Sequence, residues 1–212
     1  MSYSKRLIDI LLAVIGLVFI WPILFVCAVA VKLSSPGPVL YLGKRTGRYG
    51  VPFKIFKFRS MREDAERTGG TTTGKNDTRI TSVGKFLRKY KLDELPQLFN
   101  VLRGEMSFVG PRPEVAEYTD MYSAEEQEIL SVRPGITDLS SLTFSDLQSH
   151  VGSENPDEAF RRYVLPQKNR LRLKYAREHT ISMDFIILIK TVLLVVAKPL
   201  KSLTQNGIHK SS

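Results

Sequence analysis

The residues from Ile10 to Val31 form a run of 22 amino acids without a single charge. This run restricts the fold more than any other part of the chain, because a helix of this length can span the hydrocarbon core of a bilayer. It is too long for a secretory signal peptide, and no small-residue cleavage site follows it. The remaining residues are therefore expected to fold beside a membrane.

Pro22 lies near the middle of this run. A proline inside a helix removes a backbone hydrogen bond and bends or breaks the helix axis. Both flanks are basic, with Lys5 and Arg6 before the run and Lys32 after it, and basic flanks lie on the cytoplasmic side. We therefore predict a re-entrant helix over 1–33 that bends at Pro22. An ordinary spanning helix that tolerates its proline is the alternative.

Two side chains in this segment need partners. Asp9 is expected at the membrane interface, paired with Arg6 or Lys5 rather than functional. Trp21, beside the predicted bend, is expected to be anchored in packed protein, where its N–H group needs an acceptor.

Charge is unevenly placed along the chain. The net charge is +10, and residues 1–62 hold ten Lys or Arg against one acid, Asp9. Such a basic field suits an anionic membrane surface, phosphorylated substrates or nucleic acid, although a solvated surface looks the same. The lone Cys27 excludes an intrachain disulfide and fits a reducing compartment.

Beyond the membrane segment the sequence predicts an α+β fold that is predominantly α-helical. A chain of 212 residues buries one sizeable core rather than two, so 34–200 is predicted as one cytoplasmic domain and 201–212 as a disordered tail. Segments 39–42 and 53–58 flank a Gly-rich turn and predict one β-hairpin. The apolar run 185–197 is too short to span and predicts an amphipathic core or interfacial helix.

Asp93 and Glu94 are adjacent acids in this basic chain. A helical pattern precedes them, and Pro96 favours the start of a second helix because it has no N–H group to satisfy. The pair is therefore expected at a helix N-terminus, where unpaired N–H groups favour negative charge and attract phosphate. Taken alone, acids at a helix start are more often ordinary caps than functional groups.

Arg112 stands between Pro111 and Pro113. Pro113 disfavours helical geometry at Arg112, so little backbone freedom remains to be lost on binding. A guanidinium held in this way suits bidentate phosphate recognition. A surface turn with a solvated arginine is the alternative.

Several further motifs follow one another in a fixed order. They are Pro36-Gly37-Pro38, Lys57-Phe58-Arg59-Ser60-Met61, Asp77-Thr78-Arg79-Ile80-Thr81, Gly84-Lys85-Phe86-Leu87-Arg88, residues 92–102, residues 104–113 and Arg133-Pro134-Gly135-Ile136-Thr137. In these motifs, and in the apolar segment with its proline, the chain resembles the small bacterial monotopic polyprenyl-phosphate phosphoglycosyl transferases, the bacterial sugar transferase family. The resemblance covers residues 5–137 strongly and resumes weakly around Asp184.

The resemblance implies an enzyme that transfers sugar 1-phosphate from a UDP-sugar to a polyprenyl (undecaprenyl) phosphate and releases UMP. It implies a catalytic domain at the cytoplasmic face of the bacterial inner membrane, and Mg²⁺ as the cofactor. Asp93 is implied as the covalent nucleophile and Glu94 as the residue that holds Mg²⁺, with Asp93 also near the metal. The residues expected to bind substrate or phosphate are Arg88, Arg112, Lys57, Arg59 and, with the weakest support, Asp184. An aspartate ahead of an apolar helix is usually a cap.

The sequence departs from the family after the Arg133–Thr137 motif. Residues 138–144 replace a Gly-rich segment that contains Gln in many members, which leaves the sugar and nucleotide contacts open. The basic helix predicted over 155–178 has no role that the sequence assigns. A membrane-anchored basic module that binds anionic lipid or nucleic acid without chemistry is the rival hypothesis, yet it has no use for the acidic pair, and we expect no nucleic-acid partner. The sugar and any homo-oligomer stay open.

Overall fold

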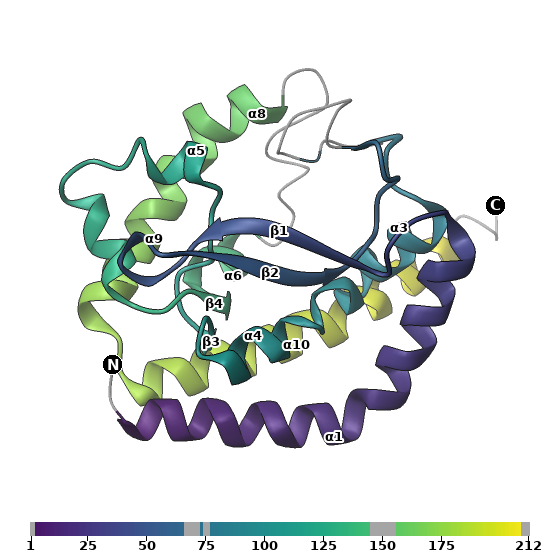
Figure 1. The fold of residues 1–212 in the computed structure, drawn as a ribbon, viewed down its shortest axis with the longest axis horizontal. Coiled ribbons are helices and arrows are strands. Elements are labelled where there is room, and N and C mark those ends of the chain that lie inside the picture. Colours follow the sequence, from purple (N-terminus) through teal and green to yellow (C-terminus); the bar gives the residue numbers. More distant parts are fainter. Residues whose placement is uncertain (1–2, 66–72, 74–76, 145–155, 209–212) are drawn as a thin grey trace.

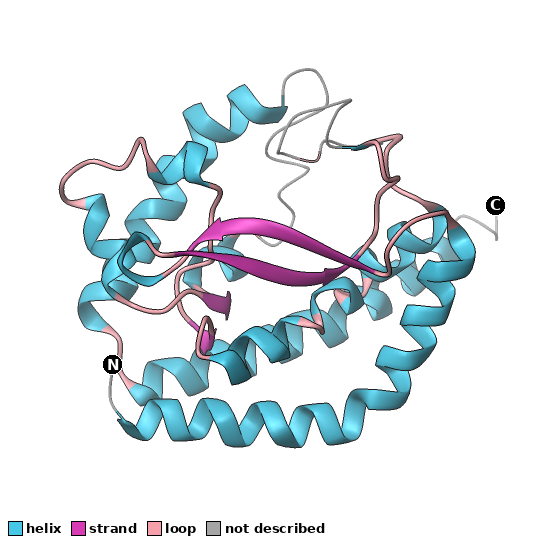
Figure 2. Ribbon diagram, viewed as in Figure 1, coloured by secondary structure: helices cyan, strands magenta, loops and turns pink. Residues whose placement is uncertain are grey.

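The computed structural model describes residues 3–65, 73, 77–144 and 156–208. It is mostly helical, with a small antiparallel sheet (Figure 2), as predicted. The elements in chain order are α1 (Tyr3–Ser34), β1 (Leu40–Thr46), η1 (Arg48–Gly50), β2 (Pro52–Phe58), α3 (Ser82–Lys89), η2 (Leu92–Glu94), α4 (Gln97–Arg103), β3 (Ser107–Val109), α5 (Ala116–Thr119), η3 (Glu126–Ser131), β4 (Gly135–Thr137), α6 (Leu139–Thr143), α8 (Pro156–Ala159), the π-helical turn η4 (Phe160–Val164), α9 (Leu165–Glu178) and α10 (Ile181–Ile208).

Helix α1 is bent. In Figure 1 it runs along the lower edge of the molecule and then turns upward at the right. Pro22 is the proline inside this helix, and its missing N–H group accounts for a bend in an otherwise continuous helix. The bend agrees with the predicted shape of the segment.

Both halves of α1 pack against the same folded domain. The first half shares a hydrophobic cluster with β2 and the α4 region, made of Ala13, Ile55, Val101 and Met106. The second half shares another with β2 and α3, made of Cys27, Val31, Phe58 and Leu87. The domain therefore lies against both arms of the bent helix, and α1 contributes to two parts of the core.

The remaining surface of α1 is apolar and exposed. Val18 and Phe19, just before the proline, are 63% and 77% exposed. Trp21 is 63% exposed, so the expectation that it is anchored in packed protein is wrong. The outer face of α10 is also apolar, with Phe185 and Ile189 among its exposed residues. An apolar surface on this scale marks an interaction site, and a lipid phase would cover it.

The polar residues at the start of α1 pair differently from the prediction. Lys5 donates to the Val109 carbonyl at 3.0 Å and forms a buried ion pair with Asp184. Asp9 instead accepts hydrogen bonds from the Ser107 hydroxyl and the Phe108 N–H group, each at 3.1 Å. Asp9 is 3% exposed rather than interfacial. These contacts fasten the beginning of α1 to the domain.

The predicted β-hairpin is confirmed. Strands β1 and β2 pair antiparallel, from Leu40 opposite Phe58 to Thr46 opposite Pro52, and they cross the centre of the molecule in Figure 1. A second pairing was not predicted: β3 and β4 lie parallel, with Ser107 opposite Gly135. Gly110 and Gly135 approach so closely that a Cβ atom on Gly135 would lie 2.1 Å from the Gly110 nitrogen.

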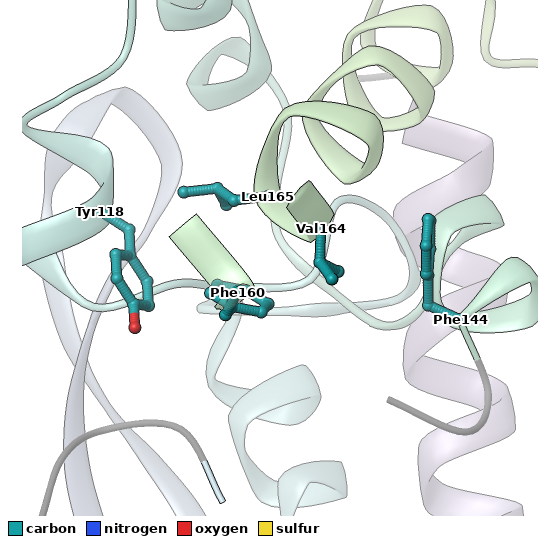
Figure 3. Packing of buried hydrophobic residues seen from close by; sticks show 5 residues of the cluster. All are labelled: Tyr118, Phe144, Phe160, Val164 and Leu165. Atoms are coloured by element: carbon teal, nitrogen blue, oxygen red, sulfur yellow. The ribbon is translucent and has the colours of Figure 1, made fainter. Parts of the chain in front are cut away.

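The helical region after Pro156 begins as predicted and contains the turn η4 before α9. It carries a further hydrophobic cluster, of Tyr118, Phe144, Phe160, Val164 and Leu165 (Figure 3). Helix α10 continues to Ile208, so residues 201–208 are helical where we expected a disordered tail. The last predicted tail residues, 209–212, lie outside the described part of the chain.

Candidate active site

The acidic pair lies in a short turn between two helices. Helix α3 is capped by Thr81, whose hydroxyl accepts from the Gly84 N–H group at 2.9 Å. Lys91 then adopts a left-handed conformation with φ of 58°, which reverses the chain. Asp93 and Glu94 follow in the 3₁₀ turn η2, and α4 begins at Gln97.

The capping explanation for the acids does not hold in the structure. The N-cap residue of α4 is Pro96, and neither α4 nor η2 has a side-chain cap. The acids therefore precede the helix by a turn instead of occupying its first turn. The carboxylate of Glu94 accepts from side chains, while Asp93 Oδ1 has no partner among the described residues.

Glu94 is held by two cations. Its carboxylate accepts a bidentate interaction from Arg112, with the Nη1–Oε2 distance at 3.1 Å, and a hydrogen bond from Lys57 Nζ at 3.2 Å. Burial opposes its ionisation, yet Arg112 and Lys57 together hold the pKa of Glu94 well below its usual range. Glu94 is thus ionised at neutral pH.

Asp93 has a different environment. It is 6% exposed, and its Oδ1 atom has no hydrogen-bond partner in the described structure. Burial and the neighbouring Glu94 charge raise the pKa of Asp93 above its ordinary value, although Lys57, Lys91 and Arg88 act in the opposite direction. The surroundings of the two adjacent carboxylates thus shift their pKa values in opposite directions.

The position of Arg112 is fixed by a buried network that the sequence did not reveal. The backbone N–H group of Arg112 donates to Asp138 Oδ2 at 3.1 Å, and its side-chain Nη1 also donates to the Ile136 carbonyl at 3.1 Å. Asp138 is fully buried and accepts from Arg172 of α9 at 3.4 Å, while Arg172 donates to Glu114 at 2.7 Å. The basic helix therefore supports the loop that carries Arg112. In the sequence, Asp138 was visible only as a departure from the family pattern.

Arg88 joins the site from α3. Its guanidinium donates to the Ser60 hydroxyl at 2.8 Å and to the Thr73 hydroxyl at 3.0 Å. Gly84 allows this approach, because a Cβ atom there would lie 1.9 Å from the Ser60 carbonyl oxygen. Burial lowers the pKa of Arg88, while the negative charge of Asp93 acts in the opposite direction. Arg88 therefore lies within the electrostatic reach of the acidic pair.

Two of the predicted site residues have their described contacts elsewhere. Arg59 is buried and donates to the Ser35 carbonyl at 2.7 Å, at the end of α1. Asp184 pairs with Lys5 and accepts from the Tyr175 hydroxyl at 2.5 Å. Both residues fasten α1 to the domain. The structure brings together Asp93, Glu94, Lys57, Arg88 and Arg112.

Gln97 is a site residue that sequence reasoning did not single out. It is fully buried, one turn after Asp93, and both polar atoms of its side-chain amide lack a hydrogen-bond partner in the described structure. Buried amides are rarely left unpaired unless a ligand or water completes them. In the sequence, only its position within the 92–102 motif could have indicated Gln97 as a site residue.

The acidic pair suits Mg²⁺ once phosphates are bound. No group of three or more His, Cys, Asp or Glu side chains among the described residues is placed to hold a metal. Mg²⁺ commonly takes only one or two carboxylates and completes its shell with substrate phosphates and water. The unpartnered Oδ1 of Asp93 and the carboxylate of Glu94 are ligands of the kind that it prefers.

The arrangement supports attack on phosphorus. A buried carboxylate with a free oxygen is a nucleophile, and fixed guanidinium groups neutralise charge on phosphoryl oxygens. The guanidinium groups of Arg88 and Arg112 and the ammonium of Lys57 act on the charges of the acidic pair. The site therefore suits a phosphate-containing substrate.

Comparison with known proteins matches residues 1–198 to the family described as bacterial sugar transferase. A UDP-glucose:undecaprenyl-phosphate glucose-1-phosphate transferase of Xanthomonas campestris pv. campestris is 40% identical over 201 residues, covering 92% of this chain and 39% of the relative. The Escherichia coli (strain K12) protein of the same name is 39% identical, covering 89% and 39%.

An Aeromonas hydrophila UDP-N-acetylgalactosamine-undecaprenyl-phosphate N-acetylgalactosaminephosphotransferase is 45% identical over 139 residues, covering 64% of this chain and 33% of the relative. The chain thus spans about two fifths or less of the length of these three relatives. The names of the relatives differ in the sugar.

Proposed function

The chain belongs to the bacterial sugar transferase family, and we propose that it transfers sugar 1-phosphate from a UDP-sugar to undecaprenyl phosphate, releasing UMP, as the first membrane step of glycoconjugate synthesis. The observation that carries the proposal is the free Oδ1 atom of buried Asp93 beside Glu94, which is itself held by Arg112 and Lys57. The named activities of the relatives support the donor and the acceptor.

In the proposed first step, Asp93 attacks the phosphorus that carries the sugar. A bond forms between Oδ1 and phosphorus, and the bond from phosphorus to the bridging oxygen of the diphosphate breaks, so UMP leaves with the electron pair. The unpartnered Oδ1 atom favours the attack, because among the described residues it has no hydrogen bond to break before it reacts. The product is an acyl phosphate of Asp93.

In the second step, a phosphate oxygen of undecaprenyl phosphate attacks the same phosphorus. The acyl bond breaks, and the carboxylate of Asp93 is regenerated. Arg88 and Arg112 hold phosphoryl oxygens in both steps, and Glu94 keeps Arg112 in place through their bidentate pair. Glu94 and Asp93 would hold Mg²⁺, which when bound would supply positive charge that offsets the charge on the phosphoryl oxygens.

The acceptor is anchored in lipid, so the site must lie at the membrane surface. We propose that α1 enters and leaves on the cytoplasmic side of the inner membrane, with its bend in the bilayer. Support comes from polar contacts near its start, where Arg6 donates to the Val101 carbonyl at 2.7 Å, and from the burial of Val31 near its end. Both ends thereby bind one domain, and most of the exposed apolar residues of α1 lie between them.

Release of UMP tests the function. Purified protein in detergent is mixed with a panel of UDP-sugars, with and without polyprenyl phosphate, and UMP and lipid-linked sugar phosphate are measured. We expect one or a few UDP-sugars to yield both products. The rival binding module binds the anionic lipid and releases no UMP from any donor, and that result would contradict the proposal.

The pH dependence of the first step follows from the Asp93 environment. Because burial raises the pKa of Asp93, its ionised and nucleophilic form is lost at a higher pH than for an exposed aspartate, whose pKa is about 3.9. We expect the rate of intermediate formation to fall as pH is lowered, starting above that value. The measurement uses donor alone, which avoids titration of the acceptor phosphate. A rate that stays flat down to the ordinary aspartate range would contradict the assignment.

Replacing Pro22 by Ala tests the membrane arrangement. Alanine restores the missing hydrogen-bond donor and lets the helix straighten, so we expect a fraction of molecules to adopt a spanning orientation. The readout is labelling of single cysteines at Ser2 and Ser34, in a Cys27→Ala background, by a membrane-impermeant reagent. If Ser2 with Pro22 intact is labelled only from the periplasmic side, the segment spans and the re-entrant arrangement is wrong.

A further inference from the structure

Lys168 is a buried cation that the mechanism above does not use. It lies on α9 and is 6% exposed. Its ammonium lies 5.4 Å from the ring centre of Phe160 and 6.0 Å from that of Phe144, two residues of the cluster in Figure 3. Among the described residues it has no hydrogen bond and no ion pair, and its Nζ atom is not completely shielded from solvent. Burying an ammonium is costly unless it is paired, and aromatic rings offset only part of that cost.

The carboxylates around Lys168 already have partners. Glu114 accepts from Arg172 at 2.7 Å. Asp138 accepts from Arg172 and from the Arg112 N–H group. Arg172 stands four residues after Lys168, on the same face of α9. Lys168 is thus placed beside the network that holds Arg112, with its own charge available.

We propose that Lys168 binds a phosphate group of the substrate, on the α9 side of the network that holds Arg112. The proposal rests on the proposed function. A nucleotide-sugar carries two phosphates, and Arg88 and Arg112 are assigned to the one that Asp93 attacks. Lys57 is engaged with Glu94, so the second phosphate, which leaves with the nucleoside, still lacks an assigned cation of the protein. Lys168 supplies it, and we therefore assign the contact to the donor diphosphate.

The charge state of Lys168 makes this contact sensitive to pH. Burial, together with Arg172 and Arg112, lowers its pKa to about 8, while Glu114 and Asp138 act in the opposite direction. The protonated ammonium binds phosphate, and the neutral amine does not. Donor binding by the free enzyme is therefore expected to weaken as pH rises through about 8.

The test compares Lys168→Met and Lys168→Arg with the wild-type protein. Methionine keeps the unbranched apolar stem of the side chain and removes the charge, so the melting temperature is expected to stay equal or rise. We expect the KM for the donor to increase about tenfold or more, since one hydrogen bond to a charged group is lost. The rise in KM above pH 8 is expected to disappear in Lys168→Arg, because a guanidinium stays protonated.

Binding of UDP gives a readout that does not depend on turnover. UDP is expected to raise the melting temperature of the wild type and to raise that of Lys168→Met less. Unchanged donor KM, acceptor KM and UDP stabilisation in Lys168→Met would overturn the proposal. An increase confined to the acceptor KM would support phosphate binding but assign it to the acceptor. If the wild type turns over no UDP-sugar, the proposed function fails, and the UDP comparison still decides whether Lys168 binds phosphate.

Discussion

Asp93→Asn is expected to abolish transfer. The amide keeps the shape of the side chain and lacks the nucleophilic oxygen, so kcat should fall by about four orders of magnitude or more. The fold should survive, because Asp93 is buried and its pKa is raised. A carboxyl with a raised pKa destabilises the folded protein at neutral pH, so its replacement should leave the melting temperature unchanged or higher.

Mass spectrometry of the intact protein separates a lost nucleophile from a general defect. With donor alone, the intact wild type should gain the mass of a sugar phosphate, and Asp93→Asn should gain none. Digestion should then locate the added mass on the peptide that contains Asp93. Asp120→Asn is the matched control, because it makes the same chemical change at an exposed aspartate. Activity of Asp93→Asn close to that of the wild type would exclude the covalent mechanism.

Glu94→Gln is expected to lower turnover by about 10²–10³-fold, the range found when one electrostatic group of a catalytic site is removed. The change acts in two ways, because Glu94 both holds Arg112 and Lys57 and is proposed to hold Mg²⁺. Neutral Gln cannot balance these two buried cations. The Mg²⁺ concentration needed for half-maximal rate should rise, and high Mg²⁺ should restore part of the activity.

Arg112→Lys separates the two roles of Glu94. It removes the bidentate pair and leaves the carboxylate of Glu94 in place, so turnover should fall without the same shift in Mg²⁺ dependence. For Glu94→Gln the matched control is Glu117→Gln, which makes the same chemical change at an exposed position. If Glu94→Gln leaves Mg²⁺ binding unchanged and no concentration recovers activity, Glu94 serves only to position Arg112.

Local patterns predicted the local structure. Alternation in 53–58 predicted β2, the helical period before Lys91 predicted α3, and Pro96 marked the entry to α4. The acidic pair and Arg112 were selected from single motifs, and the structure brings Glu94 of that pair into direct contact with Arg112. In these cases the neighbouring residues carried enough information.

Long-range pairings could not be predicted in the same way. Strands β3 and β4 have three residues each, which is too short for a periodic signal, and their pairing depends on the close approach of Gly110 and Gly135. Lys5 finds its acidic partner 179 residues away, in Asp184, instead of the nearby Asp9. The buried contact of Arg172 with Asp138 likewise joins two segments whose sequences look like ordinary polar surface.

The bent helix has a consequence for how the protein can be divided. We predicted a boundary near residue 33, with an anchor on one side and a domain on the other. In the structure Ala13 and Val31 are completely buried in two separate hydrophobic clusters, so the anchor is also a core helix. A water-soluble fragment that begins at residue 34 lacks one wall of its own interior. Exchange of α1 for an unrelated membrane segment would remove the same packing. The membrane segment and the folded domain therefore cannot be separated or exchanged independently.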